Sequence, residues 1–117
     1  MRRHALIPMI QAASSAVASE PIINTDCDLL SVQVEGTFTS GKIEIQGKTD
    51  EREDADWENL AVLDKSSLDL ISGFTGITAK GIYETGISGL VLVRVNVASV
   101  SGGNVTVIAS FENTNED

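Results

Sequence analysis

Residues 90–111 read LVLVRVNVASVSGGNVTVIASF, and they contain the clearest structural pattern in the chain. Every second position from 91 to 97 is a valine, and the positions between them are Leu92, Arg94, Asn96 and Ala98. The same period returns after residue 104, with an apolar series of Val105, Val107, Ala109 and Phe111. A period of two is typical of half-buried strands. Because a Gly-Gly pair lies between the two series, we predict a hairpin over residues 90–111 with its valine side in the core.

A second alternating segment lies upstream. Its apolar positions are Leu30, Val32, Val34 and Phe38, and its polar positions are Ser31, Gln33 and Glu35. After a short break, Ile43 and Ile45 alternate with Lys42, Glu44 and Gln46. We predict that these two segments form a hairpin around Ser40 and Gly41.

The remaining segments also favour strands over helices. Residues 57–64, WENLAVLD, have strand character, with Trp57 and residues 60–63 as candidate core. Residues 10–23 are interpreted as an early strand or arm followed by a turn. We predict an all-β fold, an antiparallel β-sandwich of jelly-roll or immunoglobulin-like size with about eight short strands. The chain is read as a single domain over 1–117, with an N-terminal arm at 1–10 and a flexible acidic tail at 112–117.

Composition limits the classes of function. The chain has 117 residues and a net charge of −9, from 8 basic and 17 acidic side chains. An acidic chain repels phosphate backbones, so direct nucleic-acid binding is not expected. No apolar run approaches the roughly 20 residues of a membrane span. Pro8 interrupts the short apolar segment near the N-terminus, so this segment does not satisfy the pattern of a secretory signal.

The sequence offers no recognisable catalytic constellation. His4 is the sole histidine and lies near the terminus, and no serine lies in a G-x-S-x-G context. Cys27 is the single cysteine, which excludes an intrachain disulfide and fits synthesis in a reducing cytoplasm. Its neighbours Asp26 and Asp28 would raise the thiol pKa, which opposes nucleophilic activation. We therefore predict a protein that is not an enzyme and has no cofactor.

One loop concentrates negative charge. Its acidic residues are Asp50, Glu51, Glu53, Asp54, Asp56 and Glu58, and Arg52 is the one basic residue among them. The spacing lacks the glycine and the final glutamate of an EF-hand, although a looser calcium site stays open. A pair of glycosidase carboxylates is a further reading. A solvated charge run is the simplest interpretation.

The order of these motifs resembles a small β-domain found in structural proteins of tailed bacteriophages. The resemblance covers residues 11–111 and rests on five segments, namely VQVEGTF at 32–38, IEIQG at 43–47, WENL at 57–60, GIY at 81–83 and the VRVNV strand with its following turn at 93–107. The acidic insert at 50–56 departs from the short turn usual at this place. The insert is therefore interpreted as an outward loop or as a contact to a basic patch on the capsid.

The resemblance implies a non-enzymatic virion protein, made in the bacterial cytoplasm and incorporated into the particle. A capsid decoration or head accessory protein that binds the assembled shell is the leading expectation. Expected partners are the major capsid protein or other virion proteins and further copies of the chain, with a trimer favoured. Candidate assembly contacts are Arg2, Arg3, Leu6 and Ile7 in the arm, and Asp50, Glu51, Glu53, Asp54 and Asp56 in the loop.

Three alternatives stay open from the sequence. The first is a neck or tail accessory protein. The second is a carbohydrate-binding β-sandwich, for which Trp57 and Tyr83 are the available aromatic residues. The third is a hydrolase that uses carboxylates of the acidic loop.

Overall fold

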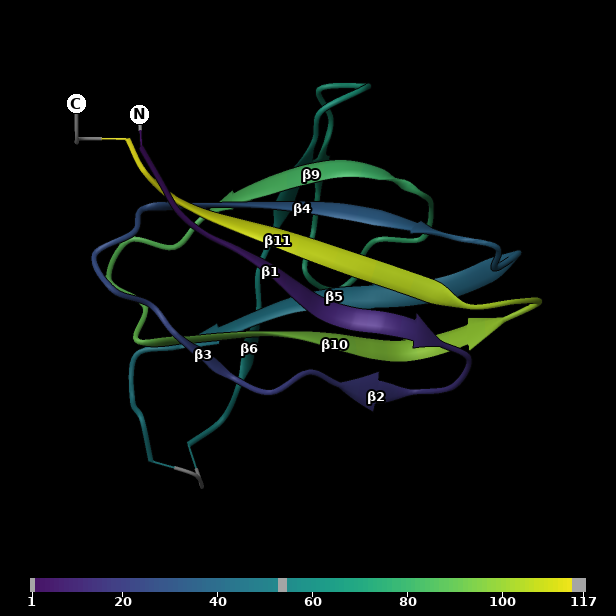
Figure 1. Ribbon diagram of the computed structural model, residues 1–117, viewed down its shortest axis with the longest axis horizontal. Helices are drawn as coiled ribbons and strands as arrows, with labels where there is room; N and C mark the ends of the chain where they lie inside the picture. The colour runs from purple at the N-terminus through teal and green to yellow at the C-terminus, as the bar shows by residue number, and fades with distance from the viewer. Residues whose placement is uncertain (1, 53–54, 115–117) are drawn as a thin grey trace.

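The computed structural model describes residues 2–52 and 55–114, and within them it contains strands, turns and loops (Figure 1). No helix that could span a membrane occurs in this part of the chain. The strands are β1 (Arg2–Ala13), β2 (Val17–Ala18), β3 (Ile22–Ile23), β4 (Leu29–Gly36), β5 (Ser40–Lys48), β6 (Glu58–Asn59), β7 (Val62–Asp64), β8 (Leu70–Ile71), β9 (Gly81–Gly86), β10 (Leu92–Ser101) and β11 (Val105–Asn113).

The strands form two antiparallel sheets that face each other. The six-stranded sheet has the order β1-β11-β4-β9-β7-β8, and the five-stranded sheet has the order β2-β10-β5-β6, with β3 also paired to β10. This confirms the predicted all-β sandwich. More strands are present than the sequence indicated because β2, β3, β6 and β8 are only two residues long.

The core lies between the sheets and is built from the alternating positions of the long strands. Val93, Val95 and Val97 of β10 are fully buried, as are Val107 and the other inward residues of β11. Leu30, Val32 and Val34 of β4 and Ile43 and Ile45 of β5 complete the same cluster. Burying each such side chain stabilises the fold by about 1.5–3 kcal/mol. The predicted inward and outward faces of these strands are therefore confirmed.

The two predicted hairpins are wrong in their pairing. β4 belongs to the six-stranded sheet and β5 to the five-stranded sheet, so Ser40 and Gly41 do not lie in a hairpin turn. β10 and β11 are divided between the sheets in the same way. β5 pairs instead with β10, and β4 pairs with β11. The connections from β4 to β5 and from β10 to β11 therefore carry the chain across the sandwich, and the valines of β10 and β11 meet across the core.

The two crossings are hydrogen-bonded to each other. Thr37 N donates to Asn104 O at 3.0 Å, and Thr39 N donates to Ser101 O at 3.0 Å. Gly103 has φ +144° there, and a Cβ on it would come within 2.6 Å of Thr37 backbone atoms. Glycine is required at this corner because a side chain would collide with the neighbouring crossing.

The N-terminal segment differs from the arm expected over residues 1–10. From Arg2 onward it forms β1, the edge strand of the six-stranded sheet, and Arg2 pairs with Asn113 of β11. At the other terminus β11 extends to Asn113, and Thr114 N donates to Asp28 Oδ1 at 2.8 Å. The first residues of the expected tail are thus part of the sheet, and residues 115–117 lie outside the described part of the chain.

Candidate functional site: a polar sheet face and its acidic loop

Strand β5 is covered on both of its faces. Ile43 and Ile45 point into the core, and the polar residues between and after them point outward. Those polar residues are nevertheless buried, with exposed fractions of 9% for Glu44, 8% for Gln46 and 6% for Lys48. Buried polar groups are costly unless each has a partner. The outward polar side chains of β5 therefore need hydrogen-bond partners on the outer face of the five-stranded sheet.

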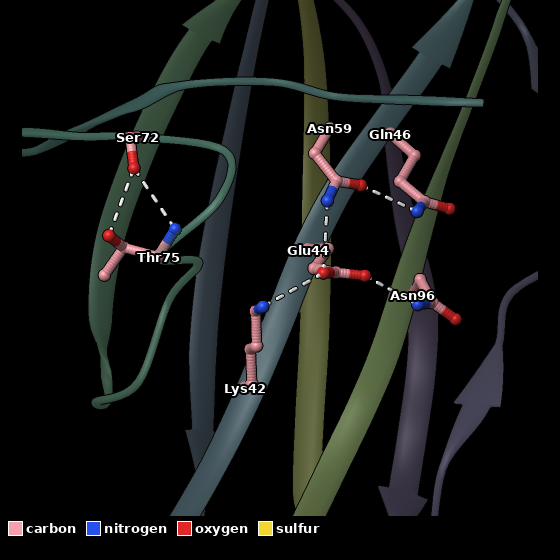
Figure 2. A network of polar contacts seen from close by, with 7 residues as sticks. All are labelled: Lys42, Glu44, Gln46, Asn59, Ser72, Thr75 and Asn96. Carbon is pink, nitrogen blue, oxygen red and sulfur yellow. Dashed lines mark hydrogen bonds and ion pairs between the residues drawn. The ribbon is translucent and has the colours of Figure 1, made fainter.

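Glu44 is the centre of this network (Figure 2). Its Oε2 accepts from Asn59 Nδ2 at 3.1 Å, and its Oε1 accepts from Asn96 Nδ2 at 2.8 Å. Lys42 Nζ lies 3.6 Å from Oε2. Because these partners come from β5, β6 and β10, a single carboxylate joins three neighbouring strands across their outer face.

Gln46 extends the network along β5. Its Nε2 donates to Asn59 Oδ1 at 2.8 Å, and its Oε1 accepts from Arg94 Nε at 2.7 Å. Figure 2 also shows Ser72 and Thr75 beside the sheet, where the two hydroxyls bond to each other at 3.1 Å within their own loop. The amide and carboxylate groups of the network use one another as partners, so this face offers few free polar groups to a ligand.

Trp57 lies on this polar face and is not part of the core. Lys48 Nζ lies 4.7 Å from the centre of an indole ring, and Arg94 Cζ lies 4.4 Å from it. Cations attract the π-face of tryptophan more strongly than that of the other aromatic residues. The prediction that Trp57 belongs to the core is therefore wrong, because two cations on the sheet surface provide a competing environment for the ring.

The acidic loop between β5 and β6 is fixed to the sheet by Lys48. Its Nζ donates to Arg52 O at 2.8 Å and to Ala55 O at 3.5 Å. Inside the loop, Arg52 Nη2 lies 2.6 Å from Asp50 Oδ2, and Arg52 N donates to Asp50 Oδ1 at 3.0 Å. The Arg52 side chain first, and its backbone N–H second, hold the pKa of Asp50 below the ordinary value. Asp50 is therefore ionised but already paired.

The candidate contact residues divide into two separate groups. Glu51 and Asp56 are exposed on the acidic loop, and Glu53 and Asp54 lie outside the described residues. In β1, Leu6 is exposed, whereas Ile7 packs against the core. The side chains of Arg2 and Arg3 lie outside the described part. β1 is the edge strand of the six-stranded sheet, whereas the acidic loop connects β5 and β6 of the five-stranded sheet and extends toward the bottom of Figure 1. The structure does not bring these groups together.

The residues considered for chemistry are distributed through the fold. Cys27 is buried, and the side chain of His4 lies outside the described residues. Tyr83 is 2% exposed, its hydroxyl donates to Ala79 O at 2.8 Å, and burial raises its pKa. In the described part of the chain, no three His, Cys, Asp or Glu side chains come together as cation ligands. Calcium binding by the acidic loop gains no support from this geometry.

The sequence alone predicted which side chains point outward on the polar face of the five-stranded sheet, but not how they pair. Alternation placed Lys42, Glu44 and Gln46 on the outside of one strand and Arg94 and Asn96 on the outside of another. Their mutual pairing could not be predicted, because it depends on β5 lying beside β10. The hairpin predicted for β5 instead placed these side chains beside the wrong strand.

Comparisons with known proteins agree with one another. The family model XepA matches residues 5–110. The crystal structure of the SPBc2 prophage-derived protein YomS superposes with a TM-score of 0.78 at 24% identity, covering 92% of this chain and 90% of that one. The crystal structure of the PBSX exported protein XepA superposes with a TM-score of 0.83 at 16% identity, covering 95% of this chain. The match spans 38% of the length of that XepA chain. No curated protein sequence matches.

Proposed function

The chain belongs to the XepA family, and from this premise we propose that it is a bacteriophage protein that acts by binding and not by catalysis. Two observations support the proposal. The similar structure YomS is a prophage-derived protein of SPBc2. The buried polar groups of the five-stranded sheet face are engaged with one another, which suits a stable surface better than a reaction centre.

The particular role we assign is that of an accessory protein of the phage particle, at the head or at the neck or tail. The observation that carries it is the acidic loop, which Lys48 holds to the sheet through Arg52 O and Ala55 O. A fixed loop loses less conformational entropy on binding than a mobile one. Its exposed Glu51 and Asp56 would face a basic surface on the shell, and a symmetric shell would repeat this weak contact many times.

A second candidate is a protein that acts outside the particle. The observation that favours it is the similarity to XepA, which is an exported protein of PBSX. In this role the acidic loop would bind a basic surface on a protein that is not part of the virion. The two candidates share the binding surface and differ in where the partner is found.

The carbohydrate-binding alternative is less well supported. Sugar rings stack on open aromatic faces, but Lys48 and Arg94 lie over the Trp57 ring. Tyr83 is buried and its hydroxyl is bonded to Ala79. Tyr83 therefore presents no platform for sugar stacking, and the Trp57 ring already has two cations against it.

Co-sedimentation with purified particles of the encoding phage tests the particle role. The wild-type protein should pellet with particles at micromolar concentration. The double variant Glu51→Lys with Asp56→Lys should bind about tenfold more weakly or worse, because it reverses two charges at the contact. A matched control reverses Glu20 and Asp69, which are exposed acidic residues outside the loop, and should bind as the wild type does.

Each outcome decides between the candidates. Wild-type protein that stays in the supernatant contradicts the particle role, and recovery from particle-free culture fluid would then favour the exported role. Equal binding by the loop variant and the control would show that the acidic loop is not the contact.

A further inference from the structure

A hollow of about 250 Å³ lies at the end of the sandwich where β5 ends and β10 begins. Leu60 and Leu90 line it, and both also pack against the core, so they form its apolar floor. Asp56 and Glu58 line the same hollow from the side of the acidic loop. The hollow therefore places an aliphatic surface directly beside carboxylates.

The hollow is built into the fold at Gly47 of β5. A Cβ on this residue would come within 2.6 Å of Leu90 Cδ1 and 3.5 Å of Leu60 Cδ1, so a side chain there would displace the two leucines. Leu60 N donates to Ile45 O at 2.8 Å, and the residue after Leu90 donates from its N to Lys48 O at 2.9 Å. Because both leucine-bearing segments are hydrogen-bonded to β5, the floor is ordered before anything binds to it.

The carboxylates around the hollow are not all in use. Asp50 also lines it, but its carboxylate is paired with Arg52 at 2.6 Å. The Lys48 ammonium donates to two loop carbonyls and is thereby engaged. Asp56 and Glu58 are exposed, and neither forms an ion pair with another residue of the described part of the chain. A cation that enters the hollow would meet these two carboxylates without displacing an existing partner.

The size and chemistry of the hollow select one kind of occupant. Its volume is below the roughly 300–1,000 Å³ of pockets that hold a drug-sized ligand, so it suits a single long side chain. Lysine packs its aliphatic stem on apolar surface and keeps its ammonium in a polar environment. Arginine favours stacking on an aromatic face, and the cations of Lys48 and Arg94 already lie over the Trp57 ring. The net charge of −9 also attracts a basic partner.

We infer that this hollow binds a lysine side chain of the partner protein, with the stem against Leu60 and Leu90 and the ammonium beside Asp56 and Glu58. The inference rests on the proposed function for the basic character of the partner, and it names the group on that partner which is recognised. A single side chain contributes a weak contact, and a symmetric partner would repeat the contact many times.

Amide NMR spectra of the isotope-labelled chain test the inference with a probe that carries one lysine side chain. Nα-acetyl-lysine methylamide should shift the amide signals of Gly47, Ala55, Leu60 and Leu90 in a saturable way below about 50 mM, since weak contacts of this kind are millimolar. Nα-acetyl-norleucine methylamide has an aliphatic side chain without the ammonium and should shift them less. Equal shifts by the two probes, or shifts that do not saturate, would overturn the inference.

Two variants separate the carboxylates from the shape of the hollow. Glu58→Gln should weaken binding of the lysine probe by about threefold, because it removes one exposed charge from the contact. Ala55→Leu enlarges a lining side chain without changing the charge, and it should weaken binding by about fivefold or more. Glu20→Gln is the matched control for charge, since Glu20 is exposed outside the hollow, and it should bind as the wild type does. Equal affinity of Glu58→Gln and Glu20→Gln would contradict the inference even if Ala55→Leu were misfolded.

Acetylated particles distinguish this inference from the particle role. Acetylation removes the charge of surface lysines, so the wild-type chain should pellet with untreated particles and not with acetylated ones. Pelleting with both would overturn the inference and leave the particle role standing. Pelleting with neither would contradict the particle role, and the probe titration would then decide the inference by itself.

Discussion

Glu44, Gln46 and Lys48 point outward from the five-stranded sheet and are each at most 9% exposed, whereas Leu6, Ile82 and Leu70 point outward from the six-stranded sheet and are each at least 49% exposed. The polar side chains are covered by one another, by Trp57 and by the acidic loop. The aliphatic side chains of the other sheet have no comparable cover. In this fold, the polarity of an outward-facing side chain therefore does not determine how much of it is exposed to water. What decides exposure is whether neighbouring strands supply partners.

The largest effect that would test this contrast is expected at Lys48. Lys48→Met removes the donor to two loop carbonyls and a cation near Trp57, and should lower the free energy of unfolding by about 2–3 kcal/mol. Lys65→Met, on the side of the six-stranded sheet, removes only an exposed ion pair with Glu84. It should change the free energy of unfolding by no more than about 0.5 kcal/mol. Urea unfolding measures both. Equal losses would show that the polar network is no tighter than a surface ion pair.

Glu44→Gln should have the next largest effect. A glutamine amide turns one acceptor into a donor, which then meets the Nδ2 group of Asn59 or Asn96. We expect a loss of about 1–2 kcal/mol in urea unfolding. Glu84→Gln is the equivalent change on the other sheet and should cost less than about 1 kcal/mol. If Glu44→Gln leaves stability unchanged, the carboxylate does not hold the three strands together.

Two buried serines should respond in opposite directions to the same substitution. Ser110→Ala removes a hydroxyl without a partner in the described part of the chain and should stabilise the monomer by about 0.5–1 kcal/mol. Ser19→Ala, at the edge of the other sheet, removes the hydroxyl that accepts a hydrogen bond from Val95 N at 2.9 Å. It should destabilise the folded chain by about 1 kcal/mol. Thermal unfolding at low protein concentration gives both values. Destabilisation by Ser110→Ala would mean that its hydroxyl has a partner after all.

The smallest effect is expected from acid. The pKa of Asp50 in the folded chain is lowered from 3.8, chiefly by the Arg52 side chain. The contribution of the ionised Asp50 side chain to loop stability is therefore complete above about pH 3.8, and it is lost as pH falls through the lowered pKa. Trp57 is the single tryptophan, and its fluorescence should change as the acidic loop loses this stabilisation at low pH. Asp50→Asn should remove this change in fluorescence.

Asp64 provides the control for this titration. Its pKa is also lowered, first by the backbone N–H of Ser66, but it lies at the end of β7 in the other sheet. Asp64→Asn should leave the acid response of Trp57 fluorescence intact. A response abolished equally by both variants would mean that the signal reports global unfolding and not the acidic loop.

Sequence alternation predicted the strands and their inward sides well, and it failed at the connections. Val93, Val95, Val97 and Val107 are buried as predicted, because burial on one side of a strand follows directly from the period of two. The segments around Gly41 and Gly103 carry glycine as hairpin turns do, yet they cross between sheets. Local turn chemistry cannot distinguish these cases, since the choice depends on partners distant in sequence. Trp57 was misplaced for the same reason, because its cations come from β5 and β10.

The position of β11 has a consequence for how the protein is made. β11 follows all the other strands in the sequence, but it lies between β1 and β4 in the six-stranded sheet. During synthesis, β1 has no strand to pair with until residues 105–113 have left the ribosome, and β4 keeps one open edge for the same time. The nascent chain must therefore remain unaggregated with two vacant strand edges separated by the width of one strand. A peptide containing residues 105–113, supplied separately, would fit this gap and complete a chain truncated before β11.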